Sequence, residues 1–308
     1  KQFRNKNITR MVGIQGVFTE SIYQSCTKSV KTCHSPDIAV CEIEKSIDLV
    51  KSGRYGPSIV DIPIDVQGSK VNILNNNYKK KISIQKEESF FELKPNDIDL
   101  IISGLNKSKK PVLWLGNGLR GIDSDELRNI ILKLNIPYLT SWTANDILHP
   151  IDKLYAGHAG TYGSRVGNLI LQSADFVLTL GTRLAIPQKG YVDEELAREA
   201  SIYVVDIDKY LLERKYQEVP FDVNINSDLN TFFKIFLEEL KIKKKQIQAN
   251  FKKSWIKKIM EWKEKYGIIN ETFMKNPKYF FQGKEFVHPY AFMKHLSDLA
   301  GPEDIFVG

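Results

Sequence analysis

The sequence is poor in cysteine. Its 308 residues include only Cys26, Cys33 and Cys41, and no Cys-x-x-Cys pair occurs. An odd number of cysteines argues against a disulfide framework, so a reducing compartment fits this composition better. His34 is the only histidine beside a cysteine, and one such pair supplies too few ligands for zinc. We therefore expect no metal ligands in this chain.

Long apolar runs are also absent. No stretch approaches the roughly 20 apolar residues that cross a bilayer, and no signal-peptide core follows Lys1. The net charge is +7, but the lysines gather at 79–81, 107–110 and 241–245 without the interleaved aromatics of a strand-binding surface. The sequence thus argues against a membrane or a nucleic acid as partner, and a cytoplasmic location is expected.

A nucleophile paired with a base is lacking as well. His158 lies in a glycine-rich loop between Gly157 and Gly160. There it is either a general base or a positioned hydrogen-bonding group, and the sequence leaves both interpretations open. We assign no catalytic residue to this chain.

What is present is a regular alternation of strands and helices. Strands are expected at 111–116, 136–140, 176–181 and 202–206, and helices at 95–105, 123–134, around 169–173 and at 230–240. Such alternation predicts an α/β fold, with a doubly wound, Rossmann-like parallel sheet as the central domain.

The flanking segments predict further parts. Apolar residues at 40, 43, 47 and 50 keep helical spacing over residues 36–50, Asp37 is expected as the N-cap, and a short strand follows at 57–63. Near the other end, Ile256, Ile259 and Trp262 indicate an amphipathic surface helix. A helix from 288 and a buried strand within 301–308 are expected after it.

These patterns set the expected boundaries. They are the C-terminal part of an α/β domain at 1–67, a linker at 68–92, the central domain at 93–240, a helical linker at 241–285 and the start of another domain at 286–308. The strand that stops at Gly308 suggests a chain that continues in the native protein.

Three predicted strand ends carry residues suited to a nucleotide. Gly116-Asn-Gly118 and Gly181-Thr-Arg183 each follow a strand, and Asp206-Ile-Asp208 follows a third. Glycines let backbone amides approach a phosphate, an arginine pairs with it, and a carboxylate accepts from a ribose hydroxyl. The first motif is equally typical of a tight turn between a strand and a helix. Together the three predict a crevice of nucleotide shape.

At this point the residues resemble a known family. Ser52-Gly-Arg-Tyr-Gly-Pro-Ser-Ile-Val-Asp-Ile-Pro-Ile-Asp-Val-Gln67 is similar to the segment that ends the first domain of acetolactate-synthase-like, thiamine-diphosphate-dependent enzymes. Gly13-Ile-Gln15 and Thr27-Lys-Ser29 stand where that family has its active-site Gln and Thr-Lys. The pattern continues in order through Lys110-Pro-Val-Leu-Trp-Leu-Gly-Asn-Gly118, Gly157-His-Ala-Gly-Thr161, Ala174-Asp175, Gly181-Thr-Arg183 and Val205-Asp-Ile-Asp208.

The resemblance implies an enzyme of three domains. They would be a pyrimidine-binding domain, a central (DHS-like) domain and a diphosphate-binding domain, of which this chain holds part of the first, the second and the opening of the third. The implied activity is decarboxylation of a 2-keto acid with transfer of the acyl group, by a large catalytic subunit acting as a transferase or lyase. The implied cofactors are thiamine diphosphate and Mg²⁺, and the implied assembly is a homodimer or homotetramer.

The family's activating Glu is expected upstream of Lys1 and its metal motif downstream of Gly308, so the 308 residues alone are expected to be inactive. Gln15 and Lys28 are expected to line the active site. In acetolactate synthases proper, the central domain also holds FAD. Its contacts, carried over motif by motif, are Arg54, Gly116, Asn117, Gly118, Ser141, Trp142, Gly157, His158, Gly160, Thr161, Gly181, Arg183, Asp206, Ile207, Ser227 and Asp228.

Two positions depart from acetolactate synthases proper. Leu184-Ala-Ile-Pro-Gln188 stands where they have Phe-Asp-Asp-Arg, and Ile64 stands where they have Lys. The chain thus resembles most the relatives of surface-polysaccharide pathways, and FAD stays an open alternative. Further hypotheses are a non-catalytic protein that binds FAD or ADP in the central crevice, and a nicotinamide dehydrogenase. The loose placement of Gly121 after Gly118 is interpreted as a missing Gly-x-Gly-x-x-Gly motif, which counts against the dehydrogenase.

Overall fold

A computed structural model describes residues 16–71, 93–148, 154–213, 221–242, 247, 252–267 and 274–307. The chain divides into two compact units, Lys1–Phe90 and Phe91–Gly308. Over the described residues, no helix is both long and apolar enough to cross a membrane. Only 68–71 of the predicted linker at 68–92 are described.

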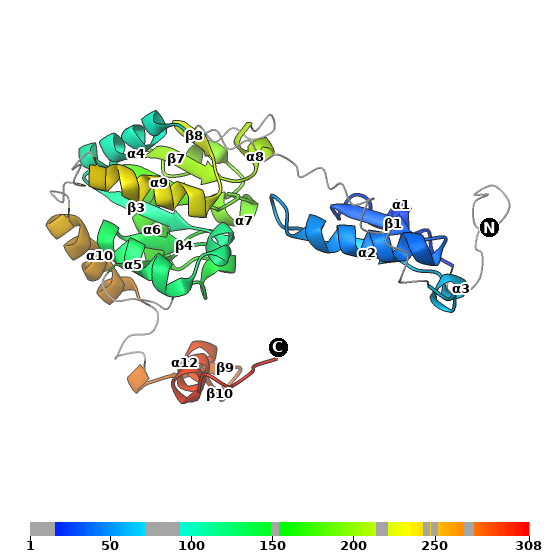
Figure 1. Cartoon of the computed structure of the whole chain (residues 1–308). Helices are drawn as coiled ribbons and strands as arrows, with labels where there is room; N and C mark the ends of the chain where they lie inside the picture. The colour runs from blue at the N-terminus through cyan, green and yellow to red at the C-terminus, as the bar shows by residue number, and fades with distance from the viewer. Residues whose placement is uncertain are drawn as a thin grey trace. The chain divides into compact units, whose positions relative to one another are not determined.

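The first unit is a small strand–helix–strand arrangement (Figure 1). Its elements are α1 (Thr19–Tyr23), β1 (Ser29–Thr32), α2 (Pro36–Val50), β2 (Ser58–Asp61) and α3 (Ile64–Gln67). β1 and β2 pair in parallel, and α2 connects them. The predicted helix at 36–50 and the strand that follows it are both present.

The start of α2 differs in one detail from the prediction. The Ser35 side chain accepts a hydrogen bond from the N–H of Ile38, so Ser35 is the N-cap and the assignment of Asp37 was wrong. Pro36 takes the first helical position, where its missing N–H costs nothing. Asp37 lies in the first turn, where its negative charge is favourable near the helix N-terminus.

The second unit contains a six-stranded parallel sheet, which confirms the predicted fold class. Its strands are β3 (Pro111–Leu115), β4 (Tyr138–Thr140), β5 (Tyr155–His158), β6 (Phe176–Leu180), β7 (Ser201–Asp206) and β8 (Val223–Asn226). They lie in the order β5-β4-β3-β6-β7-β8, and every neighbouring pair is parallel. Sequence patterns missed β5 and β8, because neither is a continuous apolar run.

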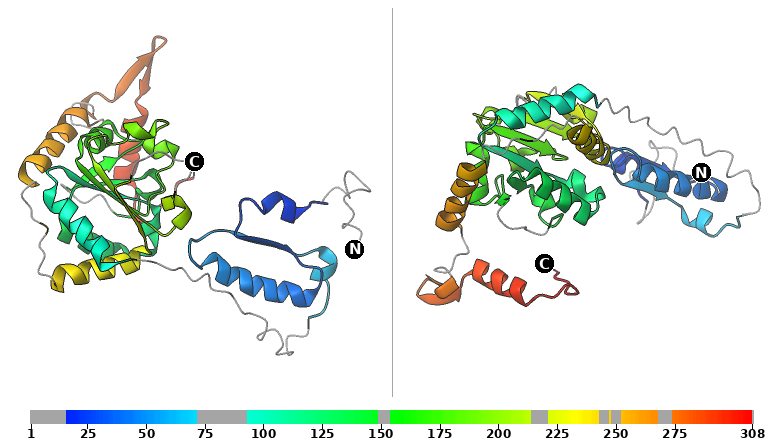
Figure 2. Two further views of the ribbon diagram at one scale, coloured as in Figure 1. Left: turned by 90° about the horizontal axis from the view of Figure 1, so that it is seen from above. Right: turned by 60° about the vertical axis from the view of Figure 1, so that its left-hand side comes forward.

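Helices cover both faces of this sheet (Figure 1 and Figure 2). One face packs against α4 (Pro95–Lys107), α5 (Ser124–Leu134) and α9 (Leu229–Ile242), and the other against α6 (Arg165–Ser173), α8 (Lys209–Glu213) and α10 (Lys252–Tyr266). Leu113 and Leu115 face the first layer, whereas Val112 and Trp114 face the second. This alternation follows from the two-residue period of a strand.

Helix α10 is part of this unit, although the sequence predicted a surface helix within a linker at 241–285. Trp255 and Ile259 are buried, while Ile256 and Trp262 are half-buried. The indole N–H of Trp255 donates to the backbone oxygen of Pro111, 3.2 Å away, at the start of β3. The apolar stripe was therefore read correctly, but its tight packing against the sheet was not foreseen.

The last described segment holds a hairpin and a helix. β9 (Lys278–Phe281) and β10 (Lys284–Val287) pair antiparallel around Gln282 and Gly283, and α12 (Pro289–Leu299) follows. The prediction of a buried strand within 301–308 was wrong. The described residues 301–307 form no strand, and their apolar side chains are exposed. A strand exists only when a neighbour pairs with it, and none of the described strands pairs with this segment.

Candidate functional site

The carboxyl ends of the six parallel strands meet at one edge of the sheet. The strand order is that of a doubly wound dinucleotide-binding fold, and the order in which strands are added to the sheet reverses between β3 and β6. In such folds ligands bind outside the carboxyl ends of the strands, at this switch point. The residues predicted for a nucleotide after β3, β4, β5, β6, β7 and β8 all lie along this edge, whereas Arg54 lies in the first unit.

Three glycines bring the ends of β3 and β6 into direct contact. A Cβ atom on Gly116 would lie 2.2 Å from the carbonyl oxygen of Gly181, and one on Gly118 would lie 2.8 Å from the Gly181 Cα. Gly181 has φ +63°, a conformation that glycine adopts without strain. The two backbones can approach this closely only because no side chains stand between them.

The amides of this turn are used inside the fold. The N–H of Gly116 donates to the Leu180 oxygen, and the N–H of Gly118 donates to the Gly181 oxygen, both at 2.9 Å. Gly121 does complete the spacing Gly-x-Gly-x-x-Gly after β3, so the predicted absence of this motif was wrong, but a Cβ there would meet nothing within 4 Å. The geometry supports the tight-turn interpretation, so a phosphate here would need other donors.

The helix after this turn offers no anion site at its N-terminus. The turn continues into a 3-10 helix, η2 (Asn117–Gly121), and α5 begins only after it. The Asp123 carboxylate caps α5 by accepting from the N–H groups of Asp125 and Glu126. Because three carboxylates crowd this terminus, it repels a phosphate.

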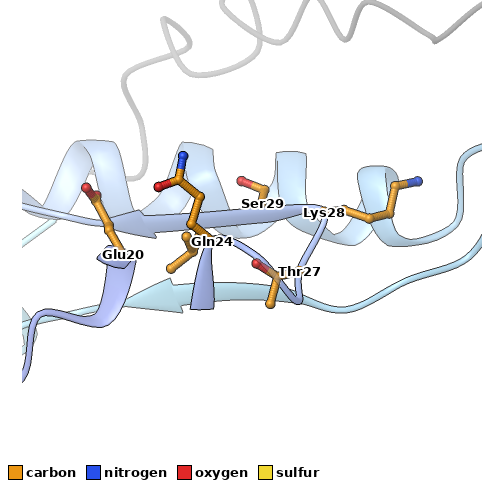
Figure 3. A pocket seen from close by; sticks show the side chains of 6 residues that line it. Glu20, Gln24, Thr27, Lys28 and Ser29 are labelled. Atoms are coloured by element: carbon orange, nitrogen blue, oxygen red, sulfur yellow. The ribbon is translucent and has the colours of Figure 1, made fainter. Parts of the chain in front are cut away.

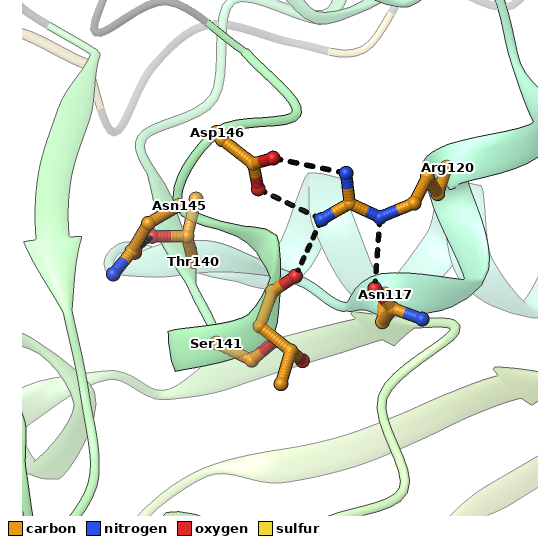
Figure 4. A network of polar contacts seen from close by, with 7 residues as sticks. Asn117, Arg120, Thr140, Ser141, Asn145 and Asp146 are labelled. Carbon is orange, nitrogen blue, oxygen red and sulfur yellow. Dashed lines mark hydrogen bonds and ion pairs between the residues drawn. The ribbon is translucent and has the colours of Figure 1, made fainter. Parts of the chain in front are cut away.

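Arg120 connects the turn after β3 to the turn after β4 (Figure 4). Its Nη1 and Nη2 donate to the two carboxylate oxygens of Asp146 at 2.9 and 2.8 Å, and Nη2 also reaches the Thr143 oxygen at 2.9 Å. Its Nε donates to Asn117 Oδ1 at 3.1 Å. The hydrogen bonds and opposite charges raise the pKa of Arg120 and lower that of Asp146. No sequence pattern linked these two residues, which stand 26 positions apart.

An exposed pair of aromatic rings lies beside this network. Trp142, in η3 (Trp142–Ala144) after β4, and Tyr162, after β5, have ring centroids 4.8 Å apart. Their side chains are 63% and 62% exposed, so both rings are available to a planar group. Tyr162 was not among the predicted residues. An aromatic residue in a glycine-rich loop gives no signal of its own, because its neighbour comes from another strand end.

His158 serves as a positioned hydrogen-bonding group. Its Nε2 lies 2.8 Å from the backbone oxygen of Tyr162. A carbonyl oxygen only accepts, so Nε2 carries a proton and donates it. Of the two interpretations left open by the sequence, this contact favours the one in which His158 shapes the loop that carries Tyr162.

The loops after β5 and β6 are joined. Gly160 has φ +124°, and a Cβ there would lie 2.4 Å from the Pro187 oxygen, to which the Thr161 N–H also donates at 2.7 Å. Gln188 accepts from the Ala185 N–H and donates to the Thr182 hydroxyl at 2.6 Å. These contacts involve the segment 184–188, which departs from the family motif.

Leu184 lies inside that segment with an unusual backbone. It is fully buried and has φ 48°, a left-handed conformation that is costly for leucine. The contacts of Gln188 on either side hold this conformation in place. Arg183, the residue before it, is exposed at the end of β6.

Several predicted contact residues at β7 and β8 have roles in the fold. The Asp206 carboxylate accepts from the N–H of Asp208, and the fully buried Ser227 donates to the Asp228 oxygen. Asp228 caps α9, because its carboxylate accepts from the N–H groups of the second and third residues that follow. The sequence carried this signal, since an aspartate before an amphipathic run is typical of an N-cap.

The predicted active-site residues of the first unit are placed in part. Gln15 lies outside the described residues. The Lys28 ammonium donates to the backbone oxygens of Leu49, Ser52 and Arg54 at 2.8, 2.6 and 3.1 Å, at the C-terminus of α2. Lys28 therefore caps that helix and fixes the turn that contains Arg54.

A polar pocket of about 290 Å³ lies nearby (Figure 3). Its lining consists of Glu20, Gln24, Thr27, Lys28, Ser29 and Val30. The Lys28 side chain extends away from Glu20 and Gln24, and the Glu20 carboxylate accepts from the Thr32 N–H at 2.8 Å. Within the described ranges, no group of three or more His, Cys, Asp or Glu side chains is placed to hold a metal ion.

Comparison with known proteins gives this geometry a context. Residues 98–236 match the thiamine pyrophosphate enzyme family, central domain. The chain is 25% identical to the acetolactate synthase large subunit of Cyanidium caldarium over 73% of this chain and 38% of that protein. It is 26% identical to acetolactate synthase 2, chloroplastic, of Nicotiana tabacum over 86% of the chain and 39% of that protein.

A third relative is the acetolactate synthase large subunit of Lactococcus lactis, 27% identical over 84% of this chain and 42% of that protein. The resemblance to acetolactate-synthase-like, thiamine-diphosphate-dependent enzymes that the motifs predicted is thereby confirmed. The chain spans about two fifths of the length of these relatives.

Proposed function

We propose that this chain is part of a thiamine-diphosphate-dependent enzyme that decarboxylates a 2-keto acid and transfers the acyl group, like the large subunit of acetolactate synthase. One observation carries the proposal: the residues that match the central domain of thiamine pyrophosphate enzymes are those that form the doubly wound sheet. The named relatives, which are acetolactate synthases, supply the reaction type.

The cofactors proposed for the reaction are thiamine diphosphate and Mg²⁺. Thiamine diphosphate supplies the electron sink that decarboxylation of a 2-keto acid requires, and Mg²⁺ anchors its two phosphates. The described side chains provide no cluster of metal ligands, so they do not fit this pair of groups. We therefore propose that other parts of the enzyme hold them, and that the 308 residues alone have no turnover.

FAD in the central crevice is a further part of the proposal. The strand order and the exposed Trp142–Tyr162 pair support a dinucleotide. The amides of Gly116 and Gly118 do not contribute, because they are used within the fold. Side chains of the strand-end loops, Arg183 among them, would have to hold the phosphates.

The departures from acetolactate synthases support a different substrate. Ile64, which replaces a lysine of the family, is 86% exposed on α3. The Leu184–Gln188 segment is held by its own hydrogen bonds and carries no acidic side chain. We propose on this basis that the enzyme is a relative from a surface-polysaccharide pathway, acting on a 2-keto acid other than that of acetolactate synthesis.

A homodimer or homotetramer in the cytoplasm completes the proposal. The three cysteines are free thiols, which supports a reducing compartment. Sedimentation of the native protein tests the assembly, and a monomer at micromolar concentration would contradict it.

The decisive experiment compares the native gene product with the 308-residue chain. The mass of the native product is measured first, and carbon dioxide release from a panel of 2-keto acids is then followed with and without thiamine diphosphate and Mg²⁺. We expect a native product near twice 35 kDa, with release that needs both cofactors, and no release by the 308 residues. A native product near 35 kDa that binds FAD or ADP without turnover would contradict the proposed enzyme activity. It would instead support a non-catalytic nucleotide-binding protein.

A further inference from the structure

We propose that Arg120 is a positioning residue of the central crevice: paired with Asp146, it holds the turn after β4 so that Trp142 lies against Tyr162. The Trp142 indole, inclined by 53° to the Tyr162 ring that supports it, then offers a face to the planar ring of a bound dinucleotide. This inference rests on the proposed binding of such a ligand, but the role of Arg120 in holding the rings can be tested without one.

The guanidinium joins two strand ends through four contacts. It reaches both oxygens of Asp146, the Thr143 backbone oxygen and the Asn117 side chain. Asn117 and Arg120 follow β3, whereas Thr143 and Asp146 follow β4. A planar fork with fixed donor directions can satisfy all of these acceptors at once, which a lysine ammonium on a flexible stem cannot do.

The turn that Arg120 holds is anchored to the sheet at its other end. The Ser141 N–H donates to the Leu115 oxygen at 2.8 Å, and the Ala144 N–H donates to the Ser141 oxygen at 2.9 Å. Trp142 stands between this anchor and the Thr143 oxygen that Arg120 contacts. With both sides of the turn fixed, the exposed indole keeps its place against Tyr162.

The pairing also explains why Arg120 is unsuited to bind a phosphate. The Nη1–Nη2 edge of the guanidinium is taken by the Asp146 carboxylate, which neutralises the positive charge, while Nε and Nη2 also donate to Asn117 and Thr143. The two side chains are 51% and 70% exposed, so solvent and salt weaken their attraction and its value for overall stability is small. What the bidentate geometry provides is a fixed direction for the turn.

The test uses the 308-residue chain and four variants. Arg120→Gln removes the charge and the fork, and Arg120→Lys keeps the charge but loses the fork. Arg128→Gln removes a charge from an exposed site on α5 and is the matched control. Tyr162→Leu shows how much of the near-ultraviolet circular dichroism comes from the ring pair, and far-ultraviolet spectra verify that each variant is folded.

Two measurements decide the outcome. Arg120→Gln and Arg120→Lys are both expected to lose the near-ultraviolet signal that Tyr162→Leu loses, and to weaken FAD binding about tenfold, which is a change of roughly 1.4 kcal/mol. Arg128→Gln is expected to match the unmodified chain in both. If the two Arg120 variants keep the near-ultraviolet signal, the positioning role is overturned.

The lysine variant separates positioning from direct anion binding. If Arg120→Lys binds FAD normally while Arg120→Gln does not, the charge alone matters and Arg120 is a phosphate ligand, contrary to the proposal. If the unmodified chain binds no FAD, the FAD part of the proposed function fails instead. The circular dichroism comparison then still decides whether Arg120 holds the ring pair.

Discussion

The two units bury very different amounts of their apolar surface. In the second unit β3, β4 and β6 are buried along their whole length between two helical layers. Among the described residues of the first unit, only Cys33, Ala39 and Val66 form a buried cluster. Each unit contains a parallel strand pair with a connecting helix, so the difference lies in the number of layers that surround the strands.

Helix α2 shows what this difference teaches. Its apolar residues have the spacing of a buried stripe, yet Ile43 and Ile47 are 41% and 50% exposed. A two-stranded sheet is too narrow to cover a helix of 15 residues. The pattern thus marks a face suited to burial, but burial itself requires a neighbouring layer that the described part of the first unit does not supply.

The chain carries separate probes for the two units. All four tryptophans lie between residues 114 and 262, and all three cysteines lie between residues 26 and 41. Tryptophan fluorescence therefore reports on unfolding of the second unit, and labelling of the buried Cys33 thiol reports on opening of the first.

The largest effect is expected from Trp255→Ala. The substitution removes a buried indole that closes one face of the sheet and donates to Pro111, so it should cost about 3–5 kcal/mol of unfolding free energy. Urea unfolding followed by the remaining tryptophans measures this loss. Ile47→Ala, which shortens an exposed side chain, is the control and should leave Cys33 labelling nearly unchanged. A loss below 1 kcal/mol for Trp255→Ala would show that α10 contributes little to the second unit.

A slightly smaller effect is expected from Gly116→Ala. The new methyl group would overlap backbone atoms of Gly181, which cannot move aside as a side chain can, at a cost of about 3 kcal/mol. Gly121→Ala is the matched control from the same turn, because its Cβ would meet nothing within 4 Å. Equal urea midpoints for the two variants would contradict the close approach of β3 and β6.

The third prediction concerns the first unit. Lys28→Met keeps the length of the side chain but removes the charge that caps α2, so it should destabilise this unit by about 1–2 kcal/mol. Cys33 labelling should become faster, while the tryptophan-detected transition stays in place. Lys51→Met, at an exposed lysine at the end of the same helix, is the control. If both variants behave alike, the three carbonyl contacts of Lys28 are not stabilising.

The smallest effect is a dependence on pH. Burial, together with the negative charge of Glu42, raises the pKa of the Cys33 thiol above its usual value of about 9. The folded state therefore holds this proton more tightly than the unfolded state. The contribution of Cys33 to the free energy of unfolding is fully present below pH 9, and it is lost as the pH rises through the raised pKa of the folded state. The labelling rate of Cys33, relative to that in the unfolded chain, should increase between pH 8 and pH 10. A constant ratio would mean that folding does not raise the pKa of this thiol.

Much of the candidate site could be predicted because strand ends can be read from a sequence. The apolar runs that end at Leu115 and Leu180 placed two glycine turns, and the run that ends at Asp206 placed a carboxylate. Parallel pairing then required these ends to share one edge of the sheet. Arg120 and Tyr162 could not be predicted in this way, because their partners come from other strand ends.

The local structure of the second unit follows from the sequence. Strand and helix periods depend on neighbouring residues, so β3, β6, α5 and α9 were expected close to where they lie. The family motifs were equally readable, because they consist of residues at fixed spacing.

How these elements and motifs are used depends on contacts that form in the folded protein. The tertiary structure shows that the amides of Gly116 and Gly118 are already bonded, that Lys28 caps a helix, and that Arg120 meets Asp146. The physical reason is common to all three cases. A hydrogen bond or a close approach depends on positions in space, and residues that are distant in the chain acquire those positions only when the layers around them are assembled.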